Sequence, residues 1–340
     1  MRATSLIALW AVSAFGQTDA FVSGLEAFRG GDYAAAEREF TRAASEGTEP
    51  RARTFLALTL AATSRCTQAE PDLETAVGGA TGDLLKLTAL ALAQCRTTES
   101  RFDEAAGVIA KIRAAYPGDA DVLYLAARLE MRQWNDTLYQ LYRQAPGSFR
   151  VNQISAEVLE TQGRFGEAVA EYRKALDKSP RTVGLHYRLG RALLMTSHEA
   201  GALELALKEF QAELSLNAHD AVAEYQVAQI FQAQGKASQA SAGFERAIAL
   251  DSGFAEPLVA LGKLRMEQKK DLEAISLLLR AVNIAPGSES ARYNLMMAYR
   301  NAGKIEEARR EKAELDKLQK TPDGEFTDFL KKLGEAPVNK

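Results

Sequence analysis

The side chains that could perform acid–base, metal or nucleophilic chemistry are scattered along this sequence of 340 residues. Its three histidines, His186, His198 and His219, are too few and too far apart to form a metal site, and none belongs to a zinc-protease motif. The glycine-rich stretch 78–83 lacks the lysine and hydroxyl residue that complete a phosphate-binding loop. A nucleophile elbow of the Gly-x-Ser-x-Gly type is also missing. Because an activity must be argued from a site, we expect no enzyme, no cofactor and no bound metal.

The composition is typical of a soluble helical protein that buries a core. Hydrophobic residues make up 46% and charged residues 26%, and only nine prolines interrupt the sequence. Alanine, leucine, glutamate, arginine and glutamine are frequent, and they favour helices because they lose little side-chain freedom there. The formal net charge of −3 argues against a nucleic-acid partner, since nucleic-acid binders normally carry a concentrated basic patch.

The first sixteen residues differ from the rest and are typical of a secretory signal peptide. An apolar run at 6–12 is followed by the small residues Ala14 and Gly16, ahead of a plausible cleavage site before Gln17. The run is too short to span a bilayer, and no later apolar stretch is long enough. We therefore expect an exported protein, periplasmic or extracellular, without a transmembrane segment. A buried first helix is the alternative.

Two cysteines, Cys66 and Cys95, fit that compartment. An oxidising environment allows a pair of thiols to form a disulfide. The alternative is two unpaired buried thiols, because free cysteine is often a small apolar core residue.

A repeat runs through the sequence and is marked by an alanine, a large residue four places later and a small residue seven places later. Four of the marker alanines are spaced by 34 residues: Ala206, Ala240, Ala274 and Ala308. A glycine precedes several markers by five residues, at Gly31, Gly163, Gly235 and Gly303. A small residue lies twelve places before the marker at Gly24, Ala156, Ala228 and Gly262.

This spacing predicts pairs of antiparallel helices joined by a tight turn. Two helix backbones approach closely only where small residues face each other, and the large residue lies one turn further along the same face. Proline after the second helix, as at Pro180 and Pro286, prevents the helix from continuing. One such pair cannot bury its apolar face alone, so successive pairs must stack.

The pattern resembles the tetratricopeptide repeat family over residues 17–320. The resemblance implies an all-α fold, a right-handed superhelical solenoid of stacked helix–turn–helix repeats whose first helices line a concave groove. About nine repeats are expected. They begin near Gln17, Pro50, Lys86, Ala120, Phe149, Val183, Ala221, Ala255 and Glu289.

Some of these repeats depart from the pattern. The second and third are degenerate, and the sixth carries an insertion around residues 195–202. The fourth is about five residues short, with Trp134 where the turn glycine belongs. The ninth is highly charged and is expected to cap the array. A tail at 321–340 contains a short amphipathic helix, which could dock on the last repeat or engage a partner.

The resemblance also suggests where the cysteines lie. Cys66 begins the second helix of the second repeat, and Cys95 lies near the end of the first helix of the third. Those helices should be antiparallel neighbours, so the two thiols should be close enough to form a disulfide.

In the same family geometry, aromatic, basic and amide side chains gather on the groove from the fifth repeat onward, and such residues are frequent in binding hot spots. We expect this groove to bind an extended peptide or protein partner, so the chain would be an exported interaction scaffold. Alternatives are that the tyrosines only pack between helices, and that the protein is an oligomerising structural subunit of a cell-envelope or secretion assembly. The predicted groove residues are Arg150, Gln153, Tyr187, Arg188, Arg191, Tyr225, Gln226, Gln229, Lys263, Tyr293, Asn294 and Arg300.

Overall fold

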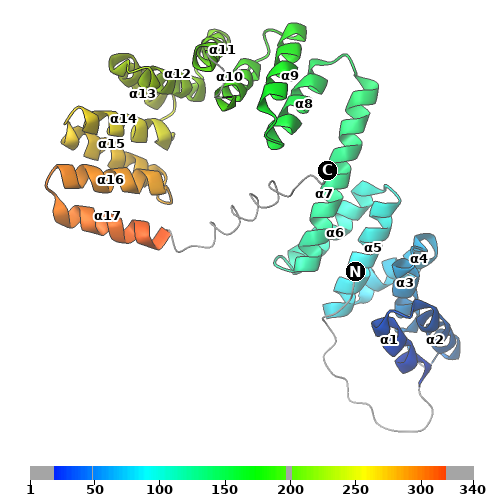
Figure 1. The fold of residues 1–340 in the computed structure, drawn as a ribbon. Helices are drawn as coiled ribbons and strands as arrows, with labels where there is room; N and C mark the ends of the chain where they lie inside the picture. Colours follow the sequence, from blue (N-terminus) through cyan, green and yellow to red (C-terminus); the bar gives the residue numbers. More distant parts are fainter. Residues whose placement is uncertain (1–18, 48, 197–200, 319–340) are drawn as a thin grey trace, which may run out of the picture. The chain divides into compact units, whose positions relative to one another are not determined.

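The structure, a computed structural model, describes residues 19–47, 49–196 and 201–318. Within these ranges it contains seventeen α-helices and no strand (Figure 1). The chain divides into an N-terminal module, Met1–Gln144, and a C-terminal module, Ala145–Lys340. The expected all-α fold of stacked helix pairs is confirmed. The predicted signal peptide at 1–16 and the tail at 321–340 lie outside the described residues.

The N-terminal module contains three helical hairpins followed by one long helix. Each second helix packs against the first helix of the next pair, so that α2 contacts α3, α4 contacts α5 and α6 contacts α7. The helices are α1 (Ala20–Gly30), α2 (Tyr33–Glu46), α3 (Ala52–Ala62), α4 (Cys66–Gly79), α5 (Gly82–Thr98), α6 (Phe102–Ala115) and α7 (Ala120–Gln144).

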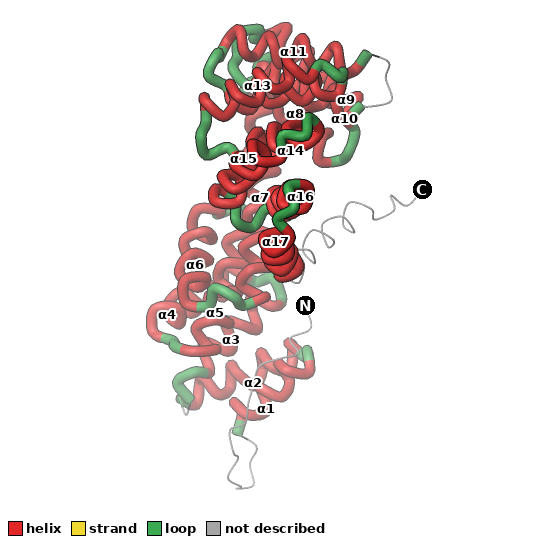
Figure 2. The backbone as a smooth tube through the Cα atoms, turned by 90° about the vertical axis from the view of Figure 1, so that its left-hand side faces the viewer, coloured by secondary structure: helices red, strands yellow, loops and turns green. Residues whose placement is uncertain are grey.

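The C-terminal module contains five hairpins that follow one another along a curved path (Figure 1). In the described part of this module, helices are the only regular secondary structure, and loops connect them (Figure 2). Its helices are α8 (Phe149–Thr161), α9 (Phe165–Lys178), α10 (Leu185–Met195), α11 (Ala202–Leu216), α12 (Ala221–Ala233), α13 (Ala237–Leu250), α14 (Ala255–Glu267), α15 (Asp271–Ile284), α16 (Glu289–Asn301) and α17 (Ile305–Leu318).

The large residue of the second helix packs against the small residue of the first helix in the hairpins α1–α2, α10–α11 and α14–α15, a contact that the sequence analysis had not predicted. Phe40, Tyr172, Phe210 and Phe244, each four places after a marker alanine, are completely buried. A methyl group added at Gly190 would lie 2.9 Å from the ring of Phe210, closer than carbon atoms normally approach. The small residue is therefore needed because the aromatic ring occupies the space beside the first helix.

The turn inside each hairpin depends on one residue with a left-handed backbone. The four predicted turn glycines all have positive φ values. Ser64, Ser100 and Lys269 occupy the same place in three other hairpins and also have φ near +60°. Glycine takes this conformation without steric cost, whereas other residues pay about 1–2 kcal/mol. The local geometry of the turn is thus the same even where the glycine has been lost.

The fourth expected repeat is not a hairpin. Its residues form the single helix α7, 25 residues long, which runs through the place where a turn was expected. Trp134 occupies that place, and a bulky aromatic residue is a poor candidate for a left-handed turn. With the repeat also too short for a loop, continuing the helix is the favourable outcome. The marker spacing alone did not reveal this.

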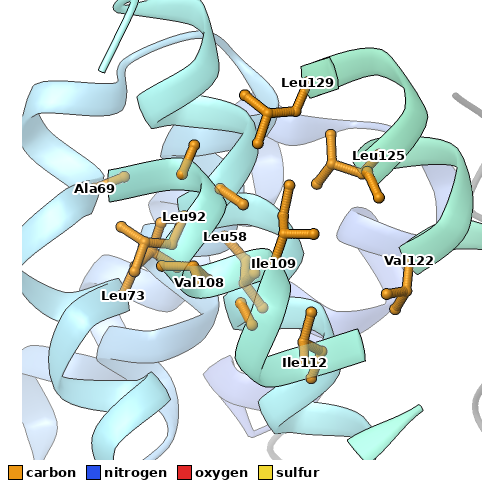
Figure 3. Close-up of a cluster of buried hydrophobic side chains, with 14 of the residues drawn as sticks. Leu58, Ala69, Leu73, Leu92, Val108, Ile109, Ile112, Val122, Leu125 and Leu129 are labelled. Atoms are coloured by element: carbon orange, nitrogen blue, oxygen red, sulfur yellow. The ribbon is translucent and has the colours of Figure 1, made fainter. Parts of the chain in front are cut away.

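The first half of α7 is firmly held by the N-terminal module. Val122, Leu125 and Leu129 are buried in the same core as Ile109 and Ile112 of α6 (Figure 3). The Lys86 ammonium, itself buried, lies 2.7 Å from Oδ2 of Asp119, and Oδ1 of the same aspartate accepts hydrogen bonds from the first N–H groups of α7. The start of α7 is therefore fixed by both packing and charge.

A disulfide joins Cys66, at the start of α4, to Cys95, in the last turn of α5. The two Cα atoms are 5.2 Å apart, within the usual range for such a bond. Beside it, Glu70 receives hydrogen bonds from Arg96 at 2.9 Å and Arg101 at 2.6 Å. The hydrogen bond from Arg101, followed by that from Arg96, lowers the pKa of Glu70. Covalent and ionic contacts thus link α4, α5 and the residue preceding α6.

Candidate peptide-binding surface

All twelve predicted groove residues lie on the first helices of the five C-terminal hairpins. We call the surface formed by α8, α10, α12, α14 and α16 the first-helix face. The helices that present it are held by the buried cores between successive hairpins. The structure nevertheless gives these twelve side chains different surroundings, and they fall into three groups.

The two arginines of α10 form ion pairs inside the protein. Nη1 of Arg188 lies 3.2 Å from Oε1 of Glu157, and Nη2 of Arg191 lies 2.9 Å from Oε2 of Glu160. Both glutamates belong to α8, the first helix of the preceding hairpin. A ligand carboxylate would therefore have to compete with a carboxylate that is already in place.

The rest of the α8 surface belongs to the same polar network. Nη1 of Arg150 donates to Oε1 of Gln153 at 2.7 Å, and Nε2 of Gln153 donates to Oε1 of Glu157 at 2.9 Å. Beneath it, burial and then the charge of Glu160 raise the pKa of Tyr172 to about 12. The α8–α10 part of the face is thus largely satisfied by its own hydrogen bonds.

Two of the three predicted tyrosines pack into the hairpins. The Tyr187 ring lies 5.7 Å from that of Phe210, and the Tyr225 ring lies 5.8 Å from Phe244 and 5.2 Å from Phe254. Burial raises the pKa of both tyrosines. Their rings therefore stabilise the stack, as the packing alternative proposed.

Two amides near these tyrosines have different settings. Gln229 is exposed and donates a hydrogen bond of 2.8 Å to the hydroxyl of Tyr225. Gln226 is only partly exposed. On α16, Asn294 is 8% exposed, and its amide donates to the backbone oxygen of Ser290 at 2.7 Å. Asn294 is thus used inside its own helix.

The third group is open to a ligand. Lys263 on α14 and Arg300 on α16 are exposed, and in the described part of the chain no carboxylate lies within ion-pair distance of either. Nη1 of Arg300 donates only a weak hydrogen bond to the Met297 sulfur, at 3.8 Å. Tyr293, also on α16, is 50% exposed and makes no ring contact with the described residues. Within the described part of the chain, two cations without a carboxylate partner and one aromatic ring are therefore open to solvent.

Sequence analysis missed one buried charge that positions this face. Glu213 of α11 is completely buried and accepts hydrogen bonds from the backbone N–H groups of Gly184, at 2.7 Å, and Tyr187, at 3.2 Å. It therefore caps the start of α10, where Gly184 has no side chain to do so. A signal was present: Glu213 stands seven places after Ala206, where most other repeats have a small residue.

Within residues 19–47, 49–196 and 201–318, no three His, Cys, Asp or Glu side chains gather in a way that could hold a metal ion. Nor does this part of the chain include a helix with the length and apolar character that a bilayer span requires.

A sequence model of the tetratricopeptide repeat matches three stretches, residues 21–83, 155–221 and 225–289, which together make up more than half of the chain. The protein belongs to the tetratricopeptide repeat family. The unmatched stretch between the first two includes most of α5 and all of α6 and α7. The family assignment from the repeat pattern is thus confirmed, and the gap in the match coincides with the third and fourth repeats.

Solved structures of repeat proteins resemble parts of this family member. A crystal structure of MamA is 21% identical, covers 51% of this chain and 93% of its own, and has a TM-score of 0.44. MamA from Desulfovibrio magneticus RS-1 is 15% identical, with coverages of 52% and 97% and a TM-score of 0.45. YrrB, described as a TPR protein with an unusual peptide-binding site, is 18% identical, with coverages of 57% and 97% and a TM-score of 0.42. No curated protein matches the chain.

Proposed function

We propose that this protein is a binding scaffold that holds an extended, acidic segment of a partner protein along the α12–α16 part of its first-helix face. The observation that supports the proposal is the exposure of Lys263 and Arg300, neither of which has a carboxylate within ion-pair distance in the described residues, with exposed Tyr293 two turns before Arg300 on the same helix. Unpaired cations on a rigid helical support are ready to meet carboxylates. An exposed aromatic ring adds a large contact surface that costs little conformational entropy.

The α8–α10 part of the face is a weaker candidate because its charges are already paired. Displacing Glu157 or Glu160 from the arginines would leave a carboxylate without its partner, and that cost would offset any gain from the ligand. We therefore assign Arg188 and Arg191 to holding α10 against α8, and assign ligand contact to Lys263, Tyr293 and Arg300. Gln229 can extend the contact surface toward α12.

A triple substitution tests this assignment. Short peptides that bind the full chain are first selected from a random display library, and their affinities are then measured by fluorescence anisotropy. The triple variant Lys263→Ala, Tyr293→Ala, Arg300→Ala should bind them at least tenfold more weakly, because truncating an interface anchor commonly costs 1–2 kcal/mol or more. Its helical content should not change, since the three side chains are exposed and surface substitutions have small effects on stability.

A matched control separates a specific surface from a general loss of charge. The variant Lys208→Ala, Leu272→Ala, Arg280→Ala removes two exposed cations and one exposed apolar residue from second helices. It should bind as well as the unmodified chain. Equal losses in both variants, or selected peptides without an excess of acidic residues, would contradict the proposed face.

We further propose that the protein works outside the cytoplasm. The Cys66–Cys95 disulfide supports this, because such bonds persist in oxidising compartments and are rare in reducing ones. The predicted leader at 1–16 would direct export. N-terminal sequencing of the protein produced in its native cell should begin near Gln17; a start at Met1 would show that the leader is retained.

A further inference from the structure

Helix α7 lacks the second helix that covers the first helix of every other repeat. In the hairpins the small residue of the first helix faces the second helix and is buried, as at Gly24, Ala57, Ala156 and Gly190. Ala127 holds the same place in α7 and is exposed. No helix of the described residues therefore covers the hairpin side of α7.

Because this repeat is about five residues short, Trp134 stands both at the expected turn and at the place of the marker alanine. The second half of α7 keeps the spacing of a second helix but not its small residues. Leu138 and Leu141 follow Trp134 by four and seven residues, the spacing found in the second helices, and Pro146 comes shortly after them. Because no turn precedes these residues, this segment cannot fold back onto its own first half. Leu138 and Leu141 are only partly buried, because they lack the contact with a first helix that the repeat pattern provides elsewhere.

Together the two halves of α7 form one continuous apolar stripe, which we call the α7 seam. Its residues alternate at spacings of three and four, the pattern with which one helix packs along another. Tyr124, Met131 and Trp134 are 54%, 58% and 49% exposed. Three large apolar side chains are therefore about half exposed on one side of a single helix. The seam consists of Tyr124, Ala127, Met131, Trp134, Leu138 and Leu141.

A hollow lies between α6 and α7. It measures about 420 Å³ and is lined by Ile109, Ala110 and Arg113 of α6 and by Leu129 and Glu130 of α7, among others. The N-terminal module thus leaves apolar surface open next to α7 as well as on it.

We propose that a second copy of the chain covers the α7 seam, with the two α7 helices packed antiparallel about a twofold axis. The reason lies in the repeat itself: the segment missing from each hairpin is the same segment whose apolar face is uncovered. In such a dimer the second half of α7 from each copy covers the first half of α7 in the other, which is the principle of a domain-swapped dimer.

The side chains fit this antiparallel arrangement. With the axis between residues 132 and 133, every seam residue meets a seam residue of the other copy. On the flanks, Arg128 would face Asn135, and Glu130 would face Thr137, so like charges do not meet. The seam pairs are Tyr124 with Leu141, Ala127 with Leu138, and Met131 with Trp134.

This interface lies in the N-terminal module and does not depend on the proposed peptide-binding face. The first test is the molar mass of the full chain by sedimentation velocity over a wide concentration range. A dimer is expected for the unmodified chain, and the double variant Trp134→Glu, Leu138→Glu should be monomeric with unchanged helical content. Leu272→Glu is the matched control, because Leu272 on α15 is 69% exposed and should leave the dimer intact.

The second test fixes the register. In the variant Tyr124→Cys, Leu141→Cys, the two new cysteines of one chain are seventeen residues apart, about 25 Å along the helix, which is too far for a disulfide within that helix. Antiparallel pairing brings each next to its counterpart in the other copy, so mild oxidation should give a covalent dimer. Either cysteine alone should not.

Several outcomes would overturn the proposal. One is a chain that remains monomeric at every concentration, since the seam would then be covered by something other than a second copy. Another is a dimer that survives the Trp134→Glu, Leu138→Glu substitutions. A third is a dimer in which the double-cysteine variant forms no covalent link.

Discussion

Removing the Cys66–Cys95 disulfide should destabilise the N-terminal module and leave the C-terminal module unchanged. The perturbation is the double substitution Cys66→Ala, Cys95→Ala, which keeps a small apolar residue at both positions, including the buried Cys95. The bond closes a loop with a sequence separation of 29 residues. In the chain-entropy model, closing a loop of that length lowers the entropy of the unfolded state enough to stabilise the fold by about 3.6 kcal/mol.

Hydrogen exchange followed by mass spectrometry can resolve this effect by region. Repeat arrays open locally, so loss of a local constraint accelerates exchange in the repeats that it connects. Every 1.4 kcal/mol corresponds to a factor of ten, so amides of α3 to α6 should exchange between a hundredfold and a thousandfold faster in the variant. Peptides from α12 to α16 serve as an internal control and should not change.

Two results would refute this reasoning. The first is alkylation of both cysteines in the native, unreduced protein, which would show that the bond is absent. The second is uniform acceleration across α3 to α16, because the bond would then act on the whole chain and not on the module that contains it.

Two other substitutions test charges that the structure places in the core. Glu213→Ala removes the carboxylate that caps α10 and leaves two backbone N–H groups without a hydrogen-bond acceptor. We expect the free energy of unfolding, measured with urea, to fall by about 2–4 kcal/mol. The control Glu204→Ala, at an exposed position of α11, should leave it nearly unchanged. The second substitution, Asp119→Asn, tests how the N-terminal module responds to acid. The hydrogen bond from Lys86, and then those from the α7 backbone, lower the pKa of Asp119 from its ordinary 3.8. The unfolded chain therefore takes up this proton first, so the stability from the pair is complete above about pH 4 and is lost as pH falls through the lowered value. The urea midpoint of the N-terminal module should drop more steeply below pH 4 in the unmodified chain than in Asp119→Asn; parallel curves would contradict this.

Sequence alone determined the helix pairs and the contacts within each hairpin. A marker alanine, a large residue four places later and a glycine five places before are related by the geometry of a single helix and its turn, which is local and regular. That is why the packing of Phe40 and Phe244 between helices and the turn at Gly31 could be predicted. The closeness of Cys66 and Cys95 followed from the antiparallel order of neighbouring helices.

The fourth repeat marks the limit of this local reasoning. Its first half matches the pattern, and its second half repeats the spacing of a second helix at Trp134, Leu138 and Leu141. Whether such a segment turns back or continues depends on whether a left-handed residue and a loop are present. Here both are missing, and helix propagation, which adds a hydrogen bond for each residue, decides in favour of one long helix.

Only the tertiary structure decided which candidate residues on the first-helix face remain open to a partner. The amino-acid types of Arg188, Arg191, Lys263 and Arg300 are alike, and all four were expected to serve a ligand. The first two lie opposite carboxylates of the preceding hairpin, 31 residues earlier in the chain, whereas the last two face none in the described residues. The offset with which the hairpins stack decides which side chains of successive repeats come opposite one another. Packing across the whole interface sets that offset, so it is not encoded in the spacing within one repeat.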